Sequence, residues 1–200
     1  MLLRLHVLTA LALVTGCQFV GDTGPSPPSA ERCAKAAFAA LDKDGDGFLG
    51  RKELQACPAL LNALEKYDLD RDGKVSFEEL VQRFRRFCRS QPPTKSVTFQ
   101  VLLEEKPLVG ADVRLEPEPF VQPPCKPAVG LTDTMGLTAP RTPELGLAGV
   151  YCGLYRIVIS LKDPDGREQL PSRYNVETTL GQEIAPDLPS AIIILRLTHR

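Results

Sequence analysis

Two stretches of twelve residues decide the fold of the first half of the chain: DKDGDGFLGRKE at Asp42–Glu53 and DLDRDGKVSFEE at Asp68–Glu79. Each has an aspartate at its first, third and fifth positions, a glycine at the sixth and a glutamate at the twelfth. Aspartates at alternate positions can converge on one ion, the glycine permits a sharp turn, and the glutamate can supply two oxygens. Such a cage of about seven oxygens suits calcium. We therefore predict two calcium ions per chain.

The predicted ligands also include a backbone carbonyl at the seventh position of each loop. Gly50 has no side-chain oxygen, so a water is expected at the ninth position of the first loop, whereas Ser76 can ligate directly or through water in the second. A metal-free acidic turn is the alternative, but every ligand position of the pattern is filled. The full set is Asp42, Asp44, Asp46, Phe48 and Glu53 in the first loop, and Asp68, Asp70, Asp72, Lys74, Ser76 and Glu79 in the second.

The segment Ala30–Arg89 resembles the EF-hand family, in which a helix precedes and follows each loop. Apolar residues recur at helical spacing on both sides of the loops, and Ser29 and Pro58 suit helix starts. The resemblance implies that Leu49 and Val75, at the eighth positions, meet in a short β-bridge.

One departure from calmodulin-like sensors concerns the middle of this pair. Only fourteen residues separate Glu53 from Asp68, so the middle helices should be short or nearly fused around Cys57 and Pro58. The chain also has only two methionines, whereas the target-binding grooves of sensors are rich in methionine. A wide sensor-type opening is therefore not expected.

From Lys95 onward, short alternating apolar runs between Pro- and Gly-rich turns predict an all-β sandwich. This segment resembles the carboxypeptidase-regulatory-like, or transthyretin-like, domain of exported bacterial proteins. An unrelated small sandwich is the alternative. The predicted fold class is α + β in two domains, an all-α EF-hand pair followed by an all-β transthyretin-like sandwich. The resemblance depends on four pieces: Lys106–Ala111 between two strands, Thr132–Gly136 as a hairpin turn, Gly153–Ile157 opening a strand, and Pro171–Asn175 before the last pair of strands.

The first sixteen residues predict a signal peptide, with an apolar run at Val7–Val14 that is too short to span a bilayer. The run ends in Val-Thr-Gly-Cys, which resembles a bacterial lipobox, so Cys17 is the predicted lipidation site and membrane anchor. An ordinary secretory signal is the alternative. The expected organisation is a signal peptide at 1–16, a tether at 17–29, the EF-hand pair at 30–89, a linker at 90–94 and the sandwich at 95–200. The protein is thus expected on the exported face of a bacterial membrane.

Export would permit disulfides. Cys33 lies nine residues before the first loop and Cys88 nine residues after the second, at equal depth if their helices are neighbours, as they are in the EF-hand family. We predict a Cys33–Cys88 bond, a Cys125–Cys152 bond inside the sandwich, and an unpaired Cys57. Connectivity does not follow from spacing alone, and five small buried thiols are the alternative.

Composition excludes several functions. Without Arg4 the chain has a net charge of about −2, so no basic excess indicates a nucleic-acid partner. The transthyretin-like family includes an enzyme, hydroxyisourate hydrolase, that uses histidines and arginines, but the mature chain would have only His199, so we predict no enzyme. Four arginines near the end of the EF-hand pair are interpreted as a solvated face rather than a contact for anionic lipid: Arg83, Arg85, Arg86 and Arg89.

The expected function is calcium binding in a membrane-anchored lipoprotein with a structural or protein-interaction role. Its partners would be calcium, the membrane, and an unknown protein or surface polymer. A calcium-responsive regulator that exposes a partner-binding surface is a second hypothesis, and a hydroxyisourate-hydrolase-like enzyme is a third.

Overall fold

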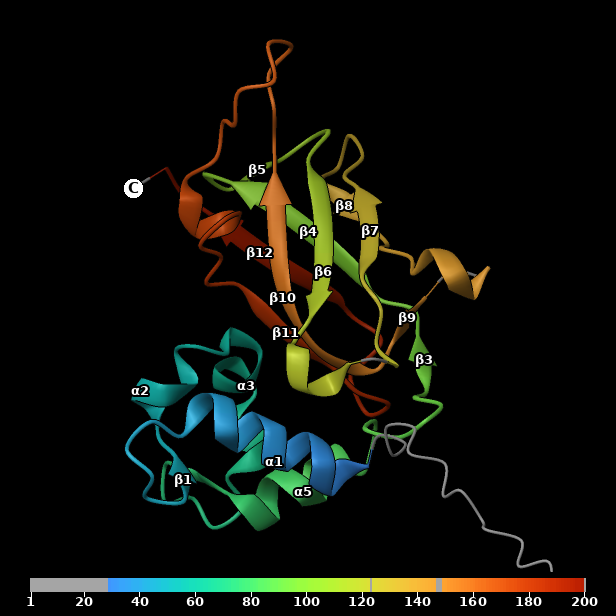
Figure 1. Cartoon of the computed structure of the whole chain (residues 1–200). Coiled ribbons are helices and arrows are strands. Elements are labelled where there is room, and N and C mark those ends of the chain that lie inside the picture. Colours follow the sequence, from blue (N-terminus) through green and yellow to red (C-terminus); the bar gives the residue numbers. More distant parts are fainter. Residues whose placement is uncertain (1–28, 123, 147–148, 200) are drawn as a thin grey trace, which may run out of the picture.

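A computed structural model describes residues 29–122, 124–146 and 149–199. The predicted signal peptide, Cys17 and all of the tether except Ser29 lie outside these residues. A group of short helices lies against one end of a two-layer β unit (Figure 1). Within the described residues, no helix has both the length and the apolar character needed to cross a membrane.

The helical unit follows the order that the two loops predict. Ser29 caps the first helix by accepting a hydrogen bond from the Arg32 backbone N–H at 3.2 Å, and Pro58 begins the third. The middle helices have only four or five residues each, which confirms the expectation of short helices between the loops. The helices are α1 (Ala30–Leu41), α2 (Arg51–Leu54), α3 (Pro58–Asn62), α4 (Leu64–Tyr67) and α5 (Phe77–Phe84).

The β unit contains two four-stranded sheets. One has the strand order β11-β10-β6-β7; in the other, β4 pairs with β12 on one edge and with β5 and β8 on the opposite edge. A small pair, β3 and β9, lies beside them. The strands are β3 (Thr94–Lys95), β4 (Thr98–Leu103), β5 (Lys106–Pro107), β6 (Asp112–Pro117), β7 (Ala128–Leu131), β8 (Leu137–Thr138), β9 (Val150–Tyr151), β10 (Gly153–Ser160), β11 (Gly181–Ile184) and β12 (Ile192–Leu197).

Alternate residues of the apolar runs that predicted strands are buried, among them Phe99, Val113 and Ile157. The last strand, β12, runs parallel to β4 although all other strand pairs in the described residues are antiparallel. Three 3₁₀ helices complete the unit: η1 (Pro119–Val121), η2 (Pro143–Leu145) and η3 (Ser172–Tyr174).

The prediction of a hairpin turn at Thr132–Gly136 is confirmed. The Asp133 N–H donates to the Leu137 carbonyl at 2.9 Å, and Val129 pairs antiparallel with Arg141 across the turn. Strand β8, which follows the turn, also pairs with β4 of the other sheet, so the hairpin connects the two sheets. There the Val101 N–H donates to the Gly136 carbonyl at 2.8 Å. Gly136 has φ +71° and touches β4 so closely that a side chain would collide with Val101.

The helical and β units share one continuous core. Phe84 of α5 stacks on Phe120 of η1 with ring centroids 6.2 Å apart. Gly181 of β11 lies directly under the start of α3, where a Cβ would collide with the backbone of Pro58 and Ala59. The two units predicted from composition are therefore packed against each other rather than joined only through the linker at 90–94.

Candidate metal centre

The first loop gathers its aspartates as predicted. One carboxylate oxygen from each of Asp42, Asp44 and Asp46 lies within 4.8 Å of the other two. Gly47 has φ +82°, the left-handed region that glycine adopts without steric cost, and its N–H donates to Asp42 Oδ2 at 3.2 Å. The backbone thus turns around the space on which the three carboxylates converge.

Glu53 closes this loop from the first turn of α2. Its Oε1 accepts from the Lys43 N–H at 2.7 Å, and its Oε2 accepts from the Gly50 N–H at 2.9 Å. These donors, Gly50 first, lower the pKa of Glu53 despite a small opposing contribution from burial. The carboxylate is therefore held ionised at the end of the loop, as a metal ligand must be.

The second loop repeats this arrangement with a different set. Oxygens of Asp68, Asp70 and Glu79 lie within 4.8 Å of one another, and the Asp72 carboxylate accepts from the Lys74 N–H at 2.8 Å. Partial burial raises the pKa of Glu79, but hydrogen bonds from Ser76 and Leu69 outweigh it and the pKa is lowered.

Ser76 links the second loop to α5. It caps the helix by accepting from the Glu79 N–H at 3.4 Å, and its hydroxyl donates to Glu79 Oε2 at 2.8 Å. A hydroxyl at the ninth position therefore orders both the helix start and the twelfth-position glutamate.

The two loops are joined edge to edge. Strands β1 (Phe48–Leu49) and β2 (Val75–Ser76) pair antiparallel, with Leu49 opposite Val75 and Phe48 opposite Ser76. Leu49 and Val75 are buried, which confirms the predicted bridge. Because the bridge sets the register, both seventh-position residues, Phe48 and Lys74, lie next to it.

The donors of both loops fit calcium. Among the described residues, clusters of three or more side chains that could bind a metal occur in these two loops. All their side-chain donors are oxygens, which hard cations prefer. The carboxylates are exposed or partly exposed, so an ion can enter from solvent.

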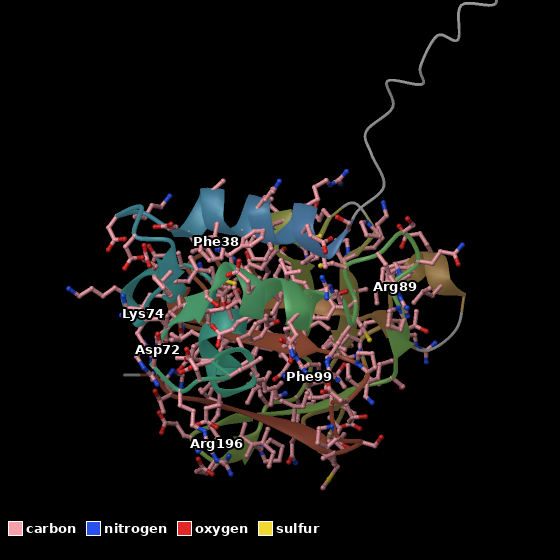
Figure 2. The ribbon with its side chains drawn as sticks, turned by 90° about the horizontal axis from the view of Figure 1, so that it is seen from below. Phe38, Asp72, Lys74, Arg89, Phe99 and Arg196 are labelled. Atoms are coloured by element: carbon pink, nitrogen blue, oxygen red, sulfur yellow. The ribbon has the colours of Figure 1, made fainter. Side chains whose placement is uncertain are left out.

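Sequence reasoning missed a contact between the loops. Lys74 Nζ lies 3.0 Å from Asp46 Oδ2 and 5.1 Å from the centroid of the Phe48 ring. This ammonium lowers the pKa of Asp46. Figure 2 shows Lys74 and Asp72 together at one end of the molecule, far from Arg89. No single-sequence signal separates this lysine from an ordinary surface lysine.

Sequence reasoning also missed a buried charge cluster between α5 and β11. Arg83 donates from Nε and Nη2 to Glu183 at 2.8 and 2.6 Å, and from Nη1 to Asp187 at 2.8 Å. Tyr67 donates its hydroxyl to Glu183 at 2.8 Å, and Lys66 lies 3.6 Å away from the same carboxylate. The Glu183 side chain is fully buried.

This cluster corrects the solvated-face interpretation for Arg83, whose side chain is only 8% exposed. Arg83 points toward the β unit because it pairs with the buried Glu183 carboxylate there. The side chains of Arg85 and Arg86 remain exposed. The one available signal was Glu183 itself, an acidic residue directly before the apolar pair Ile184 and Ala185.

No disulfide is found among the described residues, whose five cysteines are all buried thiols. The structure places the Cys33 thiol beside the Cys88 thiol. The Cys125 thiol instead donates to the backbone carbonyl of Cys152 at 3.4 Å, so its contact is with the backbone of Cys152. Cys57 lies apart from these four, beside Glu118. Both disulfides stay predictions.

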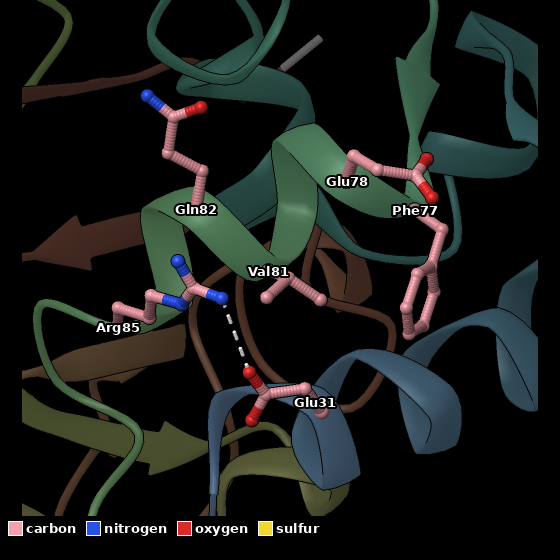
Figure 3. A pocket seen from close by; sticks show the side chains of 6 residues that line it. All are labelled: Glu31, Phe77, Glu78, Val81, Gln82 and Arg85. Atoms are coloured by element: carbon pink, nitrogen blue, oxygen red, sulfur yellow. Dashed lines mark hydrogen bonds and ion pairs between the residues drawn. The ribbon is translucent and has the colours of Figure 1, made fainter.

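A shallow groove of about 420 Å³ lies on the solvent side of the helical unit, between α1 and α5 (Figure 3). Phe77 and Val81 form its apolar floor, and Glu31 of α1 pairs with Arg85 of α5 across one end at 3.3 Å.

Comparison with known proteins supports the helical half. Residues 34–58 and 61–84 each match the EF hand family, and each match contains one complete loop. No curated protein matches the chain significantly. A leucine-rich repeat protein from Bacteroides thetaiotaomicron VPI-5482 is 10% identical, with a TM-score of 0.31; the match covers 54% of this chain and 12% of that one. At this level the likeness carries no conclusion about fold or function.

Proposed function

We propose that this EF-hand protein binds two calcium ions and uses them to hold its helical unit in shape against the β unit, on the exported face of a bacterial membrane. The observation that carries the proposal is the pair of converging carboxylate sets at Asp42–Asp46 and Asp68–Glu79. Their oxygens are already ordered by backbone donors, so little rearrangement is needed for binding.

Isothermal titration of residues 30–200 tests the stoichiometry, and we expect a value near two. With four carboxylates per loop, we expect affinities near the boundary between extracellular modules, at about 10⁻⁴–10⁻³ M, and sensors, at about 10⁻⁷–10⁻⁵ M. Glu53→Gln together with Glu79→Gln should abolish binding, whereas Glu78→Gln, an exposed neighbour outside the ligand set, should not. A stoichiometry of zero contradicts the proposal.

A structural role is favoured over a sensor role by the contacts of α5. This helix carries Glu79 of the second loop and, one turn later, Arg83 of the buried cluster. Opening the helical unit as a sensor does would expose Glu183 or break its pairing with Arg83, which is costly. Calcium is therefore proposed to stabilise one arrangement rather than to switch between two.

The groove between α1 and α5 favours the second candidate, a calcium-responsive regulator. Of the two residues that form its apolar floor, Phe77 belongs to the second loop and Val81 follows that loop by two residues. A hydrophobic dye distinguishes the two roles: a structural role predicts no rise in dye fluorescence when calcium is added. A calcium-dependent rise that Val81→Ser abolishes would favour the regulator.

The lipid anchor is supported by the sequence Val-Thr-Gly-Cys at the end of the apolar run. We propose that Cys17 is lipidated after cleavage behind Gly16, and that the segment up to Ser29 is a tether with a reach of at most about 40 Å. Cys17→Ser should release the protein or leave it unprocessed. An unmodified N-terminus elsewhere, measured by intact mass, would overturn the anchor.

The β unit is proposed to be a transthyretin-like module that acts as a spacer or contact for a protein or surface polymer, without catalytic activity. Two stacked sheets are compatible with this assignment, which otherwise depends on the sequence resemblance. Affinity capture from solubilised membranes, with and without calcium, tests the contact role. A turnover assay with hydroxyisourate tests the absence of hydrolase activity, and measurable turnover would contradict it.

A further inference from the structure

Lys74 belongs to the second loop, but its side chain lies in the first. The pairing of β1 with β2 places Lys74 beside the first loop, and its ammonium reaches Asp46 at 3.0 Å over the ring of Phe48. Lys74 donates this hydrogen bond to the Asp46 carboxylate, and the charges of Asp72 and Asp44 also lie near the ammonium. A permanent positive charge therefore lies among calcium ligands of both loops.

Asp46 cannot serve both cations equally. It is one of the three converging ligands of the first loop. One of its carboxylate oxygens, Oδ2, already accepts a hydrogen bond from the Lys74 ammonium of the same chain. The second loop has no such competitor among the described residues, because its Asp68, Asp70 and Glu79 carboxylates accept from neighbouring backbone N–H groups and, at Glu79, from the Ser76 hydroxyl. The two loops are alike in sequence, but the carboxylates of the first loop alone form an ion pair with the Lys74 ammonium among the described contacts.

We propose that Lys74 is an affinity-determining residue of the first loop, a resident cation that weakens calcium binding there and makes the two sites unequal. The inference rests on the proposed calcium binding. A calcium ion entering the first loop must draw Asp46 away from the ammonium and tolerate its repulsion. Charges of +1 and +2 about 6 Å apart in water repel enough to change Kd by about tenfold, and salt reduces this to about threefold.

The test measures each loop separately by isothermal titration. In the Glu79→Gln background, which leaves the first loop intact, Lys74→Met should tighten calcium binding by about threefold to tenfold. In the Glu53→Gln background, which leaves the second loop intact, the same change should have a smaller effect, because no second-loop carboxylate forms an ion pair with Lys74 among the described contacts.

Two control variants isolate the contact. Lys74→Arg keeps the charge and should leave the affinity of the first loop within about twofold of the unmodified value. Lys43→Met removes a charge from the first loop itself, where that lysine forms no ion pair with another described residue, and should tighten binding less than Lys74→Met does. Equal gains from the two methionine variants would overturn the assigned role of Lys74.

A second readout uses the calcium-free protein. In chelator, Lys74→Met should lower the Tm, because Asp46 and its neighbours lose their counter-charge; in saturating calcium, it should leave the Tm unchanged or raised. Raising the salt concentration should shrink both effects. Unchanged first-loop affinity in Lys74→Met overturns this inference alone, whereas absence of calcium binding in the unmodified protein overturns the proposed function with it.

Discussion

Carboxylates gather in two regions of this molecule, and the regions treat them in opposite ways. In the calcium loops, the aspartates and glutamates face solvent and are held by backbone N–H groups at most ten residues away along the chain. In the cluster at α5 and β11, Glu183 is fully buried and is held by Arg83 and Tyr67, which are 100 and 116 residues away.

The difference shows what water access decides. An exposed set of carboxylates destabilises the fold little when no cation is bound, because water solvates each charge. Such a set can therefore bind and release an ion from solution. A buried carboxylate must have a permanent counter-ion within the fold, since an unpaired charge there is strongly destabilising. The same chemical group thus makes a reversible binding site in one region and, in the other, a permanent ion pair between the helical unit and the β unit.

Breaking the ion pair between Arg83 and Glu183 should have the largest effect on stability. Arg83→Met leaves Glu183 buried without its bidentate partner, and we expect a loss of about 3–5 kcal/mol in the free energy of unfolding. Urea denaturation of the calcium-loaded protein measures it. A loss below about 1 kcal/mol would mean that Glu183 is solvated or that Lys66 replaces Arg83.

The matched control removes both charges. Arg83→Met with Glu183→Leu should recover much of the lost stability, because a buried ion pair replaced by apolar residues is often nearly neutral. Arg86→Met, which removes an exposed partner of Asp187, should change stability by less than about 1 kcal/mol.

Removing calcium should have the next largest effect. At a free calcium concentration ten times Kd, each bound ion stabilises the folded state by about 1.4 kcal/mol, or about 2.8 kcal/mol for two. Thermal unfolding with chelator and with calcium measures the difference, which should vanish in the Glu53→Gln, Glu79→Gln variant. An equal calcium response in that variant would show that the ions bind elsewhere.

The turn glycines sharpen the comparison within a loop. Gly47 has φ +82°, so Gly47→Ala should cost about 1–2 kcal/mol and weaken calcium binding. Gly50 lies in the same loop with φ −80° and room for a Cβ, so Gly50→Ala should be nearly neutral. Equal costs would contradict the backbone argument, and chemical denaturation of both variants decides it.

The smallest expected effect depends on pH. Burial raises the pKa of Glu118, although Arg156 opposes the shift. A carboxyl group whose folded pKa is raised destabilises the folded state as pH rises through that pKa. Glu118→Gln should therefore be more stable than the unmodified protein at neutral pH, within about 1 kcal/mol. The gap should close as pH falls toward the unfolded pKa of about 4.3.

This comparison is made in chelator, so that pH-dependent loss of bound calcium does not contribute. A Gln variant that is less stable at neutral pH would show that the ion pair with Arg156, at 3.0 Å, outweighs burial.

The sequence predicted the calcium loops because their ligands and turns lie within a local pattern. Alternate aspartates and turn glycines follow from twelve residues repeated after 26 residues, and the family resemblance added the Leu49–Val75 bridge. The fourteen-residue separation between the loops likewise limited the length of α2, α3 and α4. Strand positions such as those of Phe99 and Ile157 followed from alternation.

The remainder depends on contacts that no local pattern reports. Arg83 looks like any arginine near a helix end until Glu183 is placed beside it. The turn at Thr132–Gly136 likewise gives no sign that the strand after it, β8, also pairs with β4 of the other sheet. Lys74 meets Asp46 only because the bridge between the loops sets their register. Each error or omission concerns which distant partner a residue meets, not the type of element it occupies.

The contact between Arg83 and Glu183 also has a consequence in time. The ribosome completes the calcium loops first and reaches residue 183 only 100 residues after residue 83. At about 5–20 residues per second, that delay is about 5–20 s. During this interval Tyr67 lacks its carboxylate acceptor, Phe84 lacks the ring of Phe120 for part of the delay, and the start of α3 lacks the strand containing Gly181. The helical unit is thus made before the β unit but is completed only when residues near the end of the β unit have been made.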